Sequence, residues 1–271
     1  MIFMLDEVPG KQLTVTEEGE SVLTYCYGES VSCSYFHPLY APNGQVVTEE
    51  TEQRHPSGIY FTLGTVNDDN GKPIKLQRSN PAFDRETFRS SATEEPVKFV
   101  SETTWEAANP VLTEKCKVAI YPLHNDVRIL DLKVILHAAS NPITFEGEIG
   151  LGYHAVEMEH RKAANAGGKI GESEVNGQES EWATLCGISS DAAIGVAILP
   201  HLENEQTVFL AEDTYKGSLF AQTAPFSLNA NEKRELNYRV LIYIGDLFTF
   251  DVSDYYEKYI DSKNCAFLKT R

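Results

Sequence analysis

The chain has 271 residues, 42% of them hydrophobic, and its formal net charge is −17 from 40 acidic and 23 basic residues. This length and apolar content can bury a full core, and no Pro/Gly/Ser-rich linker divides the chain, which predicts one domain over residues 1–271. So negative a surface makes nucleic acid and anionic membranes poor partners, whereas neutral ligands such as sugars remain open.

The N-terminal residues 1–7 carry no basic group, and their apolar run is too short for a signal peptide. No stretch approaches the roughly 20 apolar residues of a membrane span. The chain is therefore expected to be cytoplasmic, although a chain whose signal had been removed would look the same. Its five cysteines lack a C-x-x-C pair and suit free thiols, with a Cys26–Cys33 bridge left open.

Strand patterns dominate the chain. Residues 12–27 predict a hairpin with its turn at 17–20, and Asn43-Gly44 predicts a tight turn. The clearest alternation runs from Val127 to Ala138, with Leu130 and three further apolar residues on one face. The other face carries Asp131, Lys133 and His137 beside isoleucines, which predicts that it is partly solvated or lines a cleft. Further strand runs are predicted at 117–121, 143–158, 182–188, 192–199, 207–210, 218–228 and 236–244.

One helix is predicted near the C-terminus. Ser253 can cap it, and Tyr255, Tyr256, Tyr259 and Ile260 recur at helical spacing. A second helical turn is predicted at 84–89. Residues 67–81 and 164–177 are rich in Gly, Asn and charge and are interpreted as long loops, where binding residues often lie. The pattern as a whole predicts an all-β fold, a large antiparallel β-sandwich with one C-terminal helix.

Several short segments between residues 20 and 246 resemble, in order and spacing, the family known as methane oxygenase PmoA-like. The segments are Val22-Leu23-Thr24-Tyr25, Phe36-His37-Pro38-Leu39, Pro42-Asn43-Gly44, Val47-Thr48, His55-Pro56-Ser57-Gly58-Ile59-Tyr60-Phe61, Gly64-Thr65-Val66-Asn67, Gly195-Val196-Ala197-Ile198 with His201, and Tyr215-Lys216-Gly217-Ser218-Leu219-Phe220-Ala221.

The resemblance implies a galactose-mutarotase-like β-supersandwich, not a membrane monooxygenase subunit, because the chain has no membrane span. Proteins of that architecture commonly handle sugars in a cleft on one sheet, which is an analogy from fold. The chain departs from the family's Asp-His-Pro-His-His-Arg-Gly run, where it has Arg54-His55-Pro56-Ser57-Gly58. Only one of three histidines remains there, so altered or lost chemistry stays open.

Histidines supply the candidate acid/base groups. His37 and His55 each precede a proline, which favours extended backbone, and imidazole can exchange a proton near neutral pH. If the strand through residues 153–161 stays extended, His154 and His160 share one face, while Glu157 and Glu159 share the other. The alternatives are loop histidines that bond to the backbone and a charged strand end in water. A divalent metal held by two histidines and a carboxylate is a further alternative.

A third set follows the strand at 192–199: His201, Glu203, Glu212, Asp213 and Tyr215. Substrate-binding roles are predicted at four positions. Arg161 would orient a hydroxyl or carboxylate, and Trp182 would stack on a sugar ring unless it is a core residue. Tyr215 and Asn67 lie in the segments of the resemblance.

The leading hypothesis is an enzyme that acts on a small-molecule carbohydrate, neutral or oxidised, by epimerisation, β-elimination or hydrolysis. His37, His55, His154 and His201 would be the acid/base groups, with Glu157 or Glu159 as carboxylate partner, and no metal or cofactor is expected. The alternative is a sugar-binding or structural β-domain without turnover. A redox metalloenzyme is the third reading, and a homo-oligomer remains open.

Overall fold

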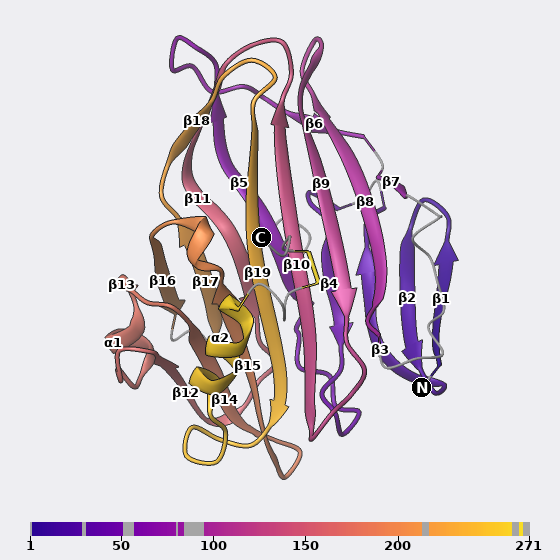
Figure 1. The fold of residues 1–271 in the computed structure, drawn as a ribbon, viewed down its shortest axis with the longest axis vertical. Coiled ribbons are helices and arrows are strands. Elements are labelled where there is room, and N and C mark those ends of the chain that lie inside the picture. Colours follow the sequence, from indigo (N-terminus) through magenta and orange to yellow (C-terminus); the bar gives the residue numbers. More distant parts are fainter. Residues whose placement is uncertain are drawn as a thin grey trace.

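The computed structural model describes residues 2–28, 31–50, 57–79, 81–83, 95–212, 217–261 and 266–267. Within these residues, two antiparallel sheets of ten and nine strands pack face to face (Figure 1). The expected all-β fold, a large antiparallel sandwich with one C-terminal helix, is therefore confirmed. No helix in the described part of the chain is both long and apolar enough to cross a membrane.

Each sheet has one continuous order of strands. The ten-stranded sheet runs β1 (Phe3–Val8), β2 (Gln12–Glu17), β3 (Glu20–Cys26), β4 (Tyr35–Leu39), β5 (Ile59–Asn67), β11 (Ile143–His154), β17 (Ser218–Thr223), β16 (Thr207–Glu212) and β13 (Gln178–Glu179), and β18 (Phe226–Leu228) pairs with β11. The nine-stranded sheet runs β12 (Glu159–Asn165), β14 (Ala183–Ser189), β15 (Ala192–Pro200), β19 (Lys233–Ile244), β10 (Val127–Ala138), β9 (Pro110–Ile120), β8 (Val97–Glu106) and β6 (Gln77–Arg78), and β7 (Ala82–Phe83) pairs with β8.

The main core lies between the sheets and includes residues from Phe3 to Ile242. The alternation predicted for β10 is confirmed, because its four leucine and valine side chains, from Leu130 to Leu136, are buried in this core. The opposite face of β10 is more enclosed than the sequence indicates. Asp131 is only 1% exposed and accepts two hydrogen bonds from Arg239, at 2.7 and 3.0 Å.

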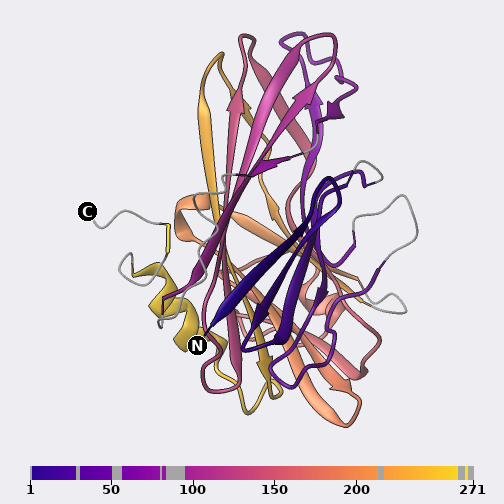
Figure 2. The ribbon, with the colours of Figure 1, turned by 90° about the vertical axis from the view of Figure 1, so that its right-hand side faces the viewer.

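Helix α2 (Val252–Ile260) covers the outer side of the nine-stranded sheet. Its buried Tyr256 and Tyr259 pack against a second apolar cluster formed by β10, β14, β15 and β19 (Figure 2, helix in yellow). The helix is capped by Asp251, whose carboxylate accepts the backbone N–H groups of Ser253 and Asp254. The prediction of Ser253 as the cap is thus wrong, since that residue lies inside the first turn.

Turn chemistry was predicted well. The β2–β3 hairpin turns at Glu18 and Gly19, and Gly44 turns the chain beside the Tyr40–Val46 bridge, all three with positive φ. Two of the long strand runs predicted from the sequence form shorter strands in the structure. The run 143–158 ends as a strand at His154, and the run 218–228 consists of β17 and β18.

The interval 164–177, interpreted as a loop, contains a short helix, α1 (Glu172–Val175). A 3-10 turn, Leu202–Asn204, follows β15. The helical turn predicted at 84–89 lies outside the described residues. Among the described residues, Cys26, Cys33, Cys116 and Cys186 are free thiols, so the Cys26–Cys33 bridge does not form.

The ten-stranded sheet has a narrow junction between β4 and β5. These strands pair only at Tyr35–Tyr60 and Phe36–Ile59, whereas β5 pairs with β11 along nearly its whole length. Between residues 61 and 65, the other edge of β5 meets no strand in the described part of the chain. The sheet therefore has a gap in its middle, immediately beside the junction.

Candidate functional site

A row of polar side chains crosses the outer face of the ten-stranded sheet. Phe36, Ile59 and Tyr153 point into the core, so their strand neighbours His37, Gly58 and His154 face outward. Backbone contacts join them side by side, since His154 donates to the carbonyl of Gly58 at 2.8 Å and a Cβ at Gly58 would lie 3.1 Å from Cβ of His37. Register continues the row, here named the histidine row, which consists of His37, Gly58, His154, Ser218 and Glu212.

A second row lies directly beside it. The strand registers pair Tyr35 with Tyr60, Tyr60 with Gly152, Gly152 with Phe220, and Phe220 with Leu210. These five residues form the tyrosine row. Residues two apart on a strand share a face, so both rows lie on the same outer surface.

The ring of Tyr60 lies over Gly152. A Cβ at Gly152 would stand 2.2 Å from Cζ of Tyr60, so only glycine leaves room for the ring there. The ring stacks on His154 at a centroid distance of 5.2 Å and on Phe220 at 6.4 Å, with interplanar angles of 16° and 26°. Three flat side chains from β5, β11 and β17 thus form one aromatic surface that links the two rows.

His37 is held by a threonine. The Thr48 hydroxyl accepts the backbone N–H of Leu39 at 3.0 Å and lies 3.0 Å from Nδ1 of His37. When Nδ1–H donates to the Thr48 hydroxyl, Nε2 of the neutral ring is left without a hydrogen. Burial lowers the pKa of His37, and the nearby Glu50 and Glu49 carboxylates oppose that shift only in part. The ring is therefore neutral at physiological pH and is able to accept a proton.

Carboxylates surround the two rows. Burial raises the pKa of Tyr60, with smaller contributions from Glu148, Cys33 and Glu212. Burial also raises the pKa of Tyr35. Both phenols therefore remain protonated at physiological pH and can donate hydrogen bonds, while the carboxylates accept them.

His201 lies on the other sheet. It follows β15, is buried beneath α2 and meets the ring of Tyr259 edge-on at 5.3 Å. Its Nδ1 accepts the backbone N–H of Glu203 at 3.2 Å, and burial lowers its pKa. Trp182 is also on that side, packed against the cluster that α2 covers. The structure does not bring either residue to the histidine row.

The predicted strand from 153 to 161 does not continue past His154. Glu157 and Glu159 are exposed, and Glu159 already belongs to the nine-stranded sheet, where it pairs with Ile188. The expectation that His154 and His160 share one extended strand is therefore wrong. His160 lies inside β12 and adopts a positive φ of 53° at the irregularity between Glu159 and Lys162.

The remaining predicted residues have separate placements. Arg161 forms an ion pair with Glu172 at 3.0 Å and lies against Gly217, which precedes Ser218 of the histidine row. Asn67 ends β5 far from the rows and donates to Glu146 at 3.0 Å. His55 and Tyr215 lie outside the described residues, so their roles stay predictions.

Several residues of this surface were not selected from the sequence. Tyr60 and Phe220 appeared only within the segments of the resemblance. The signal that marks them is the pair Gly150 and Gly152, which leaves two successive positions on one face of β11 without side chains. Glu212 was in the third predicted set, but here it lies beside Ser218 and away from His201. Among the described residues, no group of three or more His, Cys, Asp or Glu is arranged to hold a metal ion.

Comparison with known proteins gives a family match and some distant likenesses of fold. The model of a family of unknown function, DUF6807, matches residues 12–257, and the PmoA-like resemblance of short segments is not part of that match. No curated protein matches the sequence.

Solved structures with a similar course of chain include the alpha-galactosidase from Lactobacillus brevis, with 10% identity and a TM-score of 0.48 over 89% of this chain and 39% of that one. The Slr1438 protein from Synechocystis sp. PCC 6803 has 9% identity and a TM-score of 0.47, over 90% and 96% of the two chains. A GalM/aldose epimerase homologue from C. elegans has 10% identity and a TM-score of 0.36, over 90% and 98%. This chain thus spans about two fifths of the galactosidase, and none of these likenesses carries information about its chemistry.

Proposed function

The chain belongs to DUF6807, a family of unknown function, and we propose that it binds a sugar on the outer face of the ten-stranded sheet. Residues of that face would also transfer a proton to or from the sugar. The observation that carries this proposal is the histidine row. Two imidazoles flank Gly58, a position without a side chain, with a stacked aromatic surface beside them.

The separation of the two histidines suits a sugar ring. Neighbouring strands are about 4.8 Å apart, so the backbones of His37 and His154, two strands apart, are separated by roughly 10 Å. A hexose placed above Gly58 would have one imidazole on each side. The neutral His37 would accept a proton from a hydroxyl or a C–H, and His154 would provide the second proton-transfer group.

Binding would use the tyrosine row. The C–H face of a sugar packs against flat aromatic side chains, and Tyr60 and Phe220 offer such a surface. Sugar hydroxyls would find partners in Ser218, Glu212 and the phenol of Tyr35. Carboxylates around the rows, in a chain of net charge −17, disfavour an anionic sugar. A neutral sugar, or an uncharged keto form among oxidised sugars, is the best match.

A two-stage experiment tests the proposal. Thermal-shift screening of the purified chain with mono- and disaccharides and their keto derivatives identifies a ligand, because binding to the folded state raises the apparent stability. Proton NMR of that ligand in D2O then follows anomer exchange, deuterium uptake or bond cleavage. The variants H37Q and H154Q should each reduce the rate by about 10²- to 10⁴-fold. H124Q, which changes an exposed histidine on a turn, should leave the rate unchanged.

The same aromatic surface supports a second candidate, a sugar-binding domain without turnover. Tyr60, His154 and Phe220 would then provide stacking only, and no proton transfer would occur. This candidate predicts a thermal shift with a sugar but no change in that sugar by NMR, and Y60A should abolish the shift. A rate in the H37Q and H154Q variants equal to that of the unmodified chain would contradict the catalytic proposal.

A further inference from the structure

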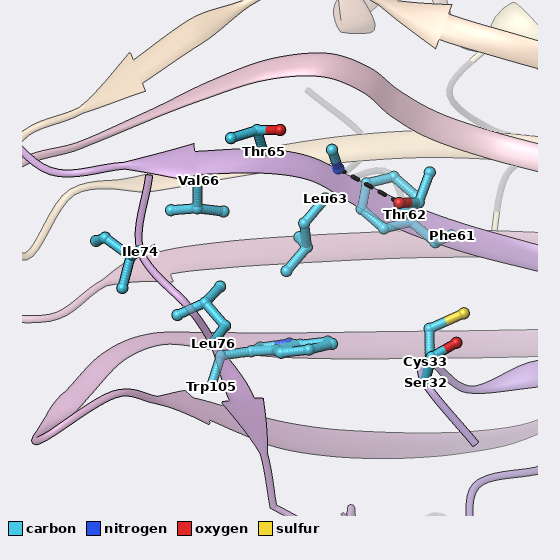
Figure 3. Close-up of a pocket in the computed structure, with 11 residues that line it drawn as sticks. Ser32, Cys33, Phe61, Thr62, Leu63, Thr65, Val66, Ile74, Leu76 and Trp105 are labelled. Atoms are coloured by element: carbon cyan, nitrogen blue, oxygen red, sulfur yellow. Dashed lines mark hydrogen bonds between the residues drawn. The ribbon is translucent and has the colours of Figure 1, made fainter. Parts of the chain in front are cut away.

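A pocket of about 440 Å³ opens at the gap in the ten-stranded sheet, beside the rows. Side chains from β5 form one wall and Trp105 of β8 faces them from the other sheet (Figure 3). The volume is within the range that small-molecule sites have in proteins. The apolar residues that line the pocket are Phe61, Leu63, Val66, Ile74, Leu76 and Trp105.

Six of the lining side chains are apolar, and the polar ones are the hydroxyls of Ser32, Thr62 and Thr65 and the thiol of Cys33. Nε1 of Trp105 donates to Glu114 at 2.9 Å, and the Thr62 hydroxyl at the rim accepts the N–H of Gly64 at 3.3 Å (Figure 3). Burial raises the pKa of the Cys33 thiol to about 12, so this side chain is neutral and behaves as a small apolar group. Sugar hydroxyls that face the six apolar side chains would lose their water partners without compensation, so an apolar ring fits this pocket better than a sugar ring.

The pocket is adjacent to the tyrosine row. Thr62 is two residues from Tyr60 on the same face of β5, a separation of about 7 Å. Cys33, on the opposite rim, lies near both Tyr35 and Tyr60. An aromatic ring attached through a glycosidic oxygen to a sugar above Tyr60 has a length similar to this separation, so it would reach the rim of the pocket at Thr62.

We propose that this pocket is a subsite for an aromatic aglycone, so that the substrate class is sugars carrying an aromatic substituent. This inference rests on the proposed function, since the sugar itself occupies the histidine and tyrosine rows. The ring of the aglycone would lie against the indole of Trp105, whose nitrogen is already bound by Glu114 and whose apolar surface is presented to the pocket.

Fluorescence of Trp105 provides the readout. The chain has two tryptophans, and in a W182F background Trp105 is the one that remains. Three probes are titrated for each of several hexoses: the methyl glycoside, the 4-nitrophenyl glycoside, and 4-nitrophenol alone. We expect the 4-nitrophenyl glycoside to bind roughly tenfold more tightly than the methyl glycoside, about 1.4 kcal/mol, and to quench Trp105.

A pocket variant and a matched control complete the test. L76R places a charge in the pocket and should remove the tenfold gain while leaving methyl glycoside binding intact, which also shows that the variant is folded. L202R is the control, because Leu202 is 58% exposed and lies on the 3-10 turn that follows β15. This variant should retain the tenfold gain in affinity for the 4-nitrophenyl glycoside.

One result would overturn the aglycone subsite, and a different result would overturn the proposed function. If the methyl and 4-nitrophenyl glycosides bind equally and Trp105 is not quenched, the aglycone subsite is wrong while sugar binding on the rows stands. If no methyl glycoside binds but 4-nitrophenol quenches Trp105 in the background variant and not in L76R, the proposed function fails and only the aromatic preference of the pocket remains.

Discussion

The aromatic ring of Tyr60 occupies the space in which a side chain at residue 152 would stand, with 2.2 Å between its Cζ and an ideal Cβ at Gly152. This contact fixes the position of the ring between His154 and Phe220. Glycine at 152 is thus as much a part of the candidate site as the side chains around it.

The variant G152A should displace Tyr60 and weaken sugar binding by roughly tenfold, a difference of about 1.4 kcal/mol. Overpacking of this kind also costs about 1–3 kcal/mol of stability. Isothermal titration with the sugar identified by screening measures the first effect, and urea unfolding measures the second.

Two other glycines are controls for this variant. G167A changes a surface glycine whose nearest neighbour would be 3.4 Å away, and should alter neither quantity. G195A would press on Tyr243 of the other sheet at 2.2 Å, and should reduce stability but not affinity. Equal loss of affinity in G152A and G195A would show that Gly152 acts through stability alone.

Stability should fall in acid. The pKa values of His37 and His201 are both lowered in the folded chain by burial, so the unfolded chain binds more protons as the pH falls. Their stabilising effect is complete above the ordinary histidine pKa of about 6.5 and is lost as the pH falls through the folded values. Urea midpoints at pH 7.5 and pH 5 should therefore differ less in H201Q than in the unmodified chain, while H124Q should show the full difference.

The reaction rate should also decline at low pH, again because a histidine is protonated. Protonation of His37 removes the base, so the rate with the identified sugar should decline as the pH falls below about 6.5. A pH–rate profile measures the decline, with H124Q retaining it. If the residual rate of H37Q declines over the same pH range, the decline is caused by another group.

The buried ion pair between Asp131 and Arg239 should be far more important for stability than an exposed ion pair. Asp131 accepts two hydrogen bonds from Arg239, one from the Tyr121 hydroxyl at 2.8 Å and one from the N–H of Ala266 at 3.2 Å. D131N keeps the volume but removes the carboxylate charge that faces the buried guanidinium, and should cost about 3–5 kcal/mol in urea unfolding. The exposed pair of Asp254 with Lys258 is the control, and D254N should change stability only slightly.

The cap of α2 distinguishes two neighbouring residues. D251A removes the carboxylate that accepts two backbone N–H groups and should destabilise the chain by about 1 kcal/mol, measured by thermal unfolding. S253A should have less effect because Ser253 is inside the helix. A larger loss of stability in S253A than in D251A would show that Ser253, the residue that the sequence favours, is the cap.

Local patterns predicted what depends on neighbours in the sequence. Alternation located β10, and Asn43-Gly44 and the turn at 17–20 located two hairpins. The capping residue was missed because Asp251 and Ser253 are both good N-caps, and only the backbone shows which of them precedes the helix. The end of β11 was missed because Val156 and Met158 continue the alternation of residue types beyond His154, where the strand ends.

The rows could not be predicted because they depend on register between distant strands. Tyr60 is opposite Gly152 only because β5 pairs with β11, with more than 70 residues between the two strands. His201 resembled the other histidines in sequence, following a strand in the same way, but that strand belongs to the other sheet and its end is covered by α2. Choosing His154 over His201 required the tertiary pairing.

The junction between β4 and β5 sets the precision of the candidate site. His37 belongs to the N-terminal four strands and His154 to the strands beyond, and β4 and β5 pair at only two positions. A small rotation of one group against the other would change the gap between the imidazoles and widen the entrance beside Trp105 at the same time. A ligand that contacts both groups of strands would hold them together across this junction, so hydrogen exchange in β4 should slow when it binds.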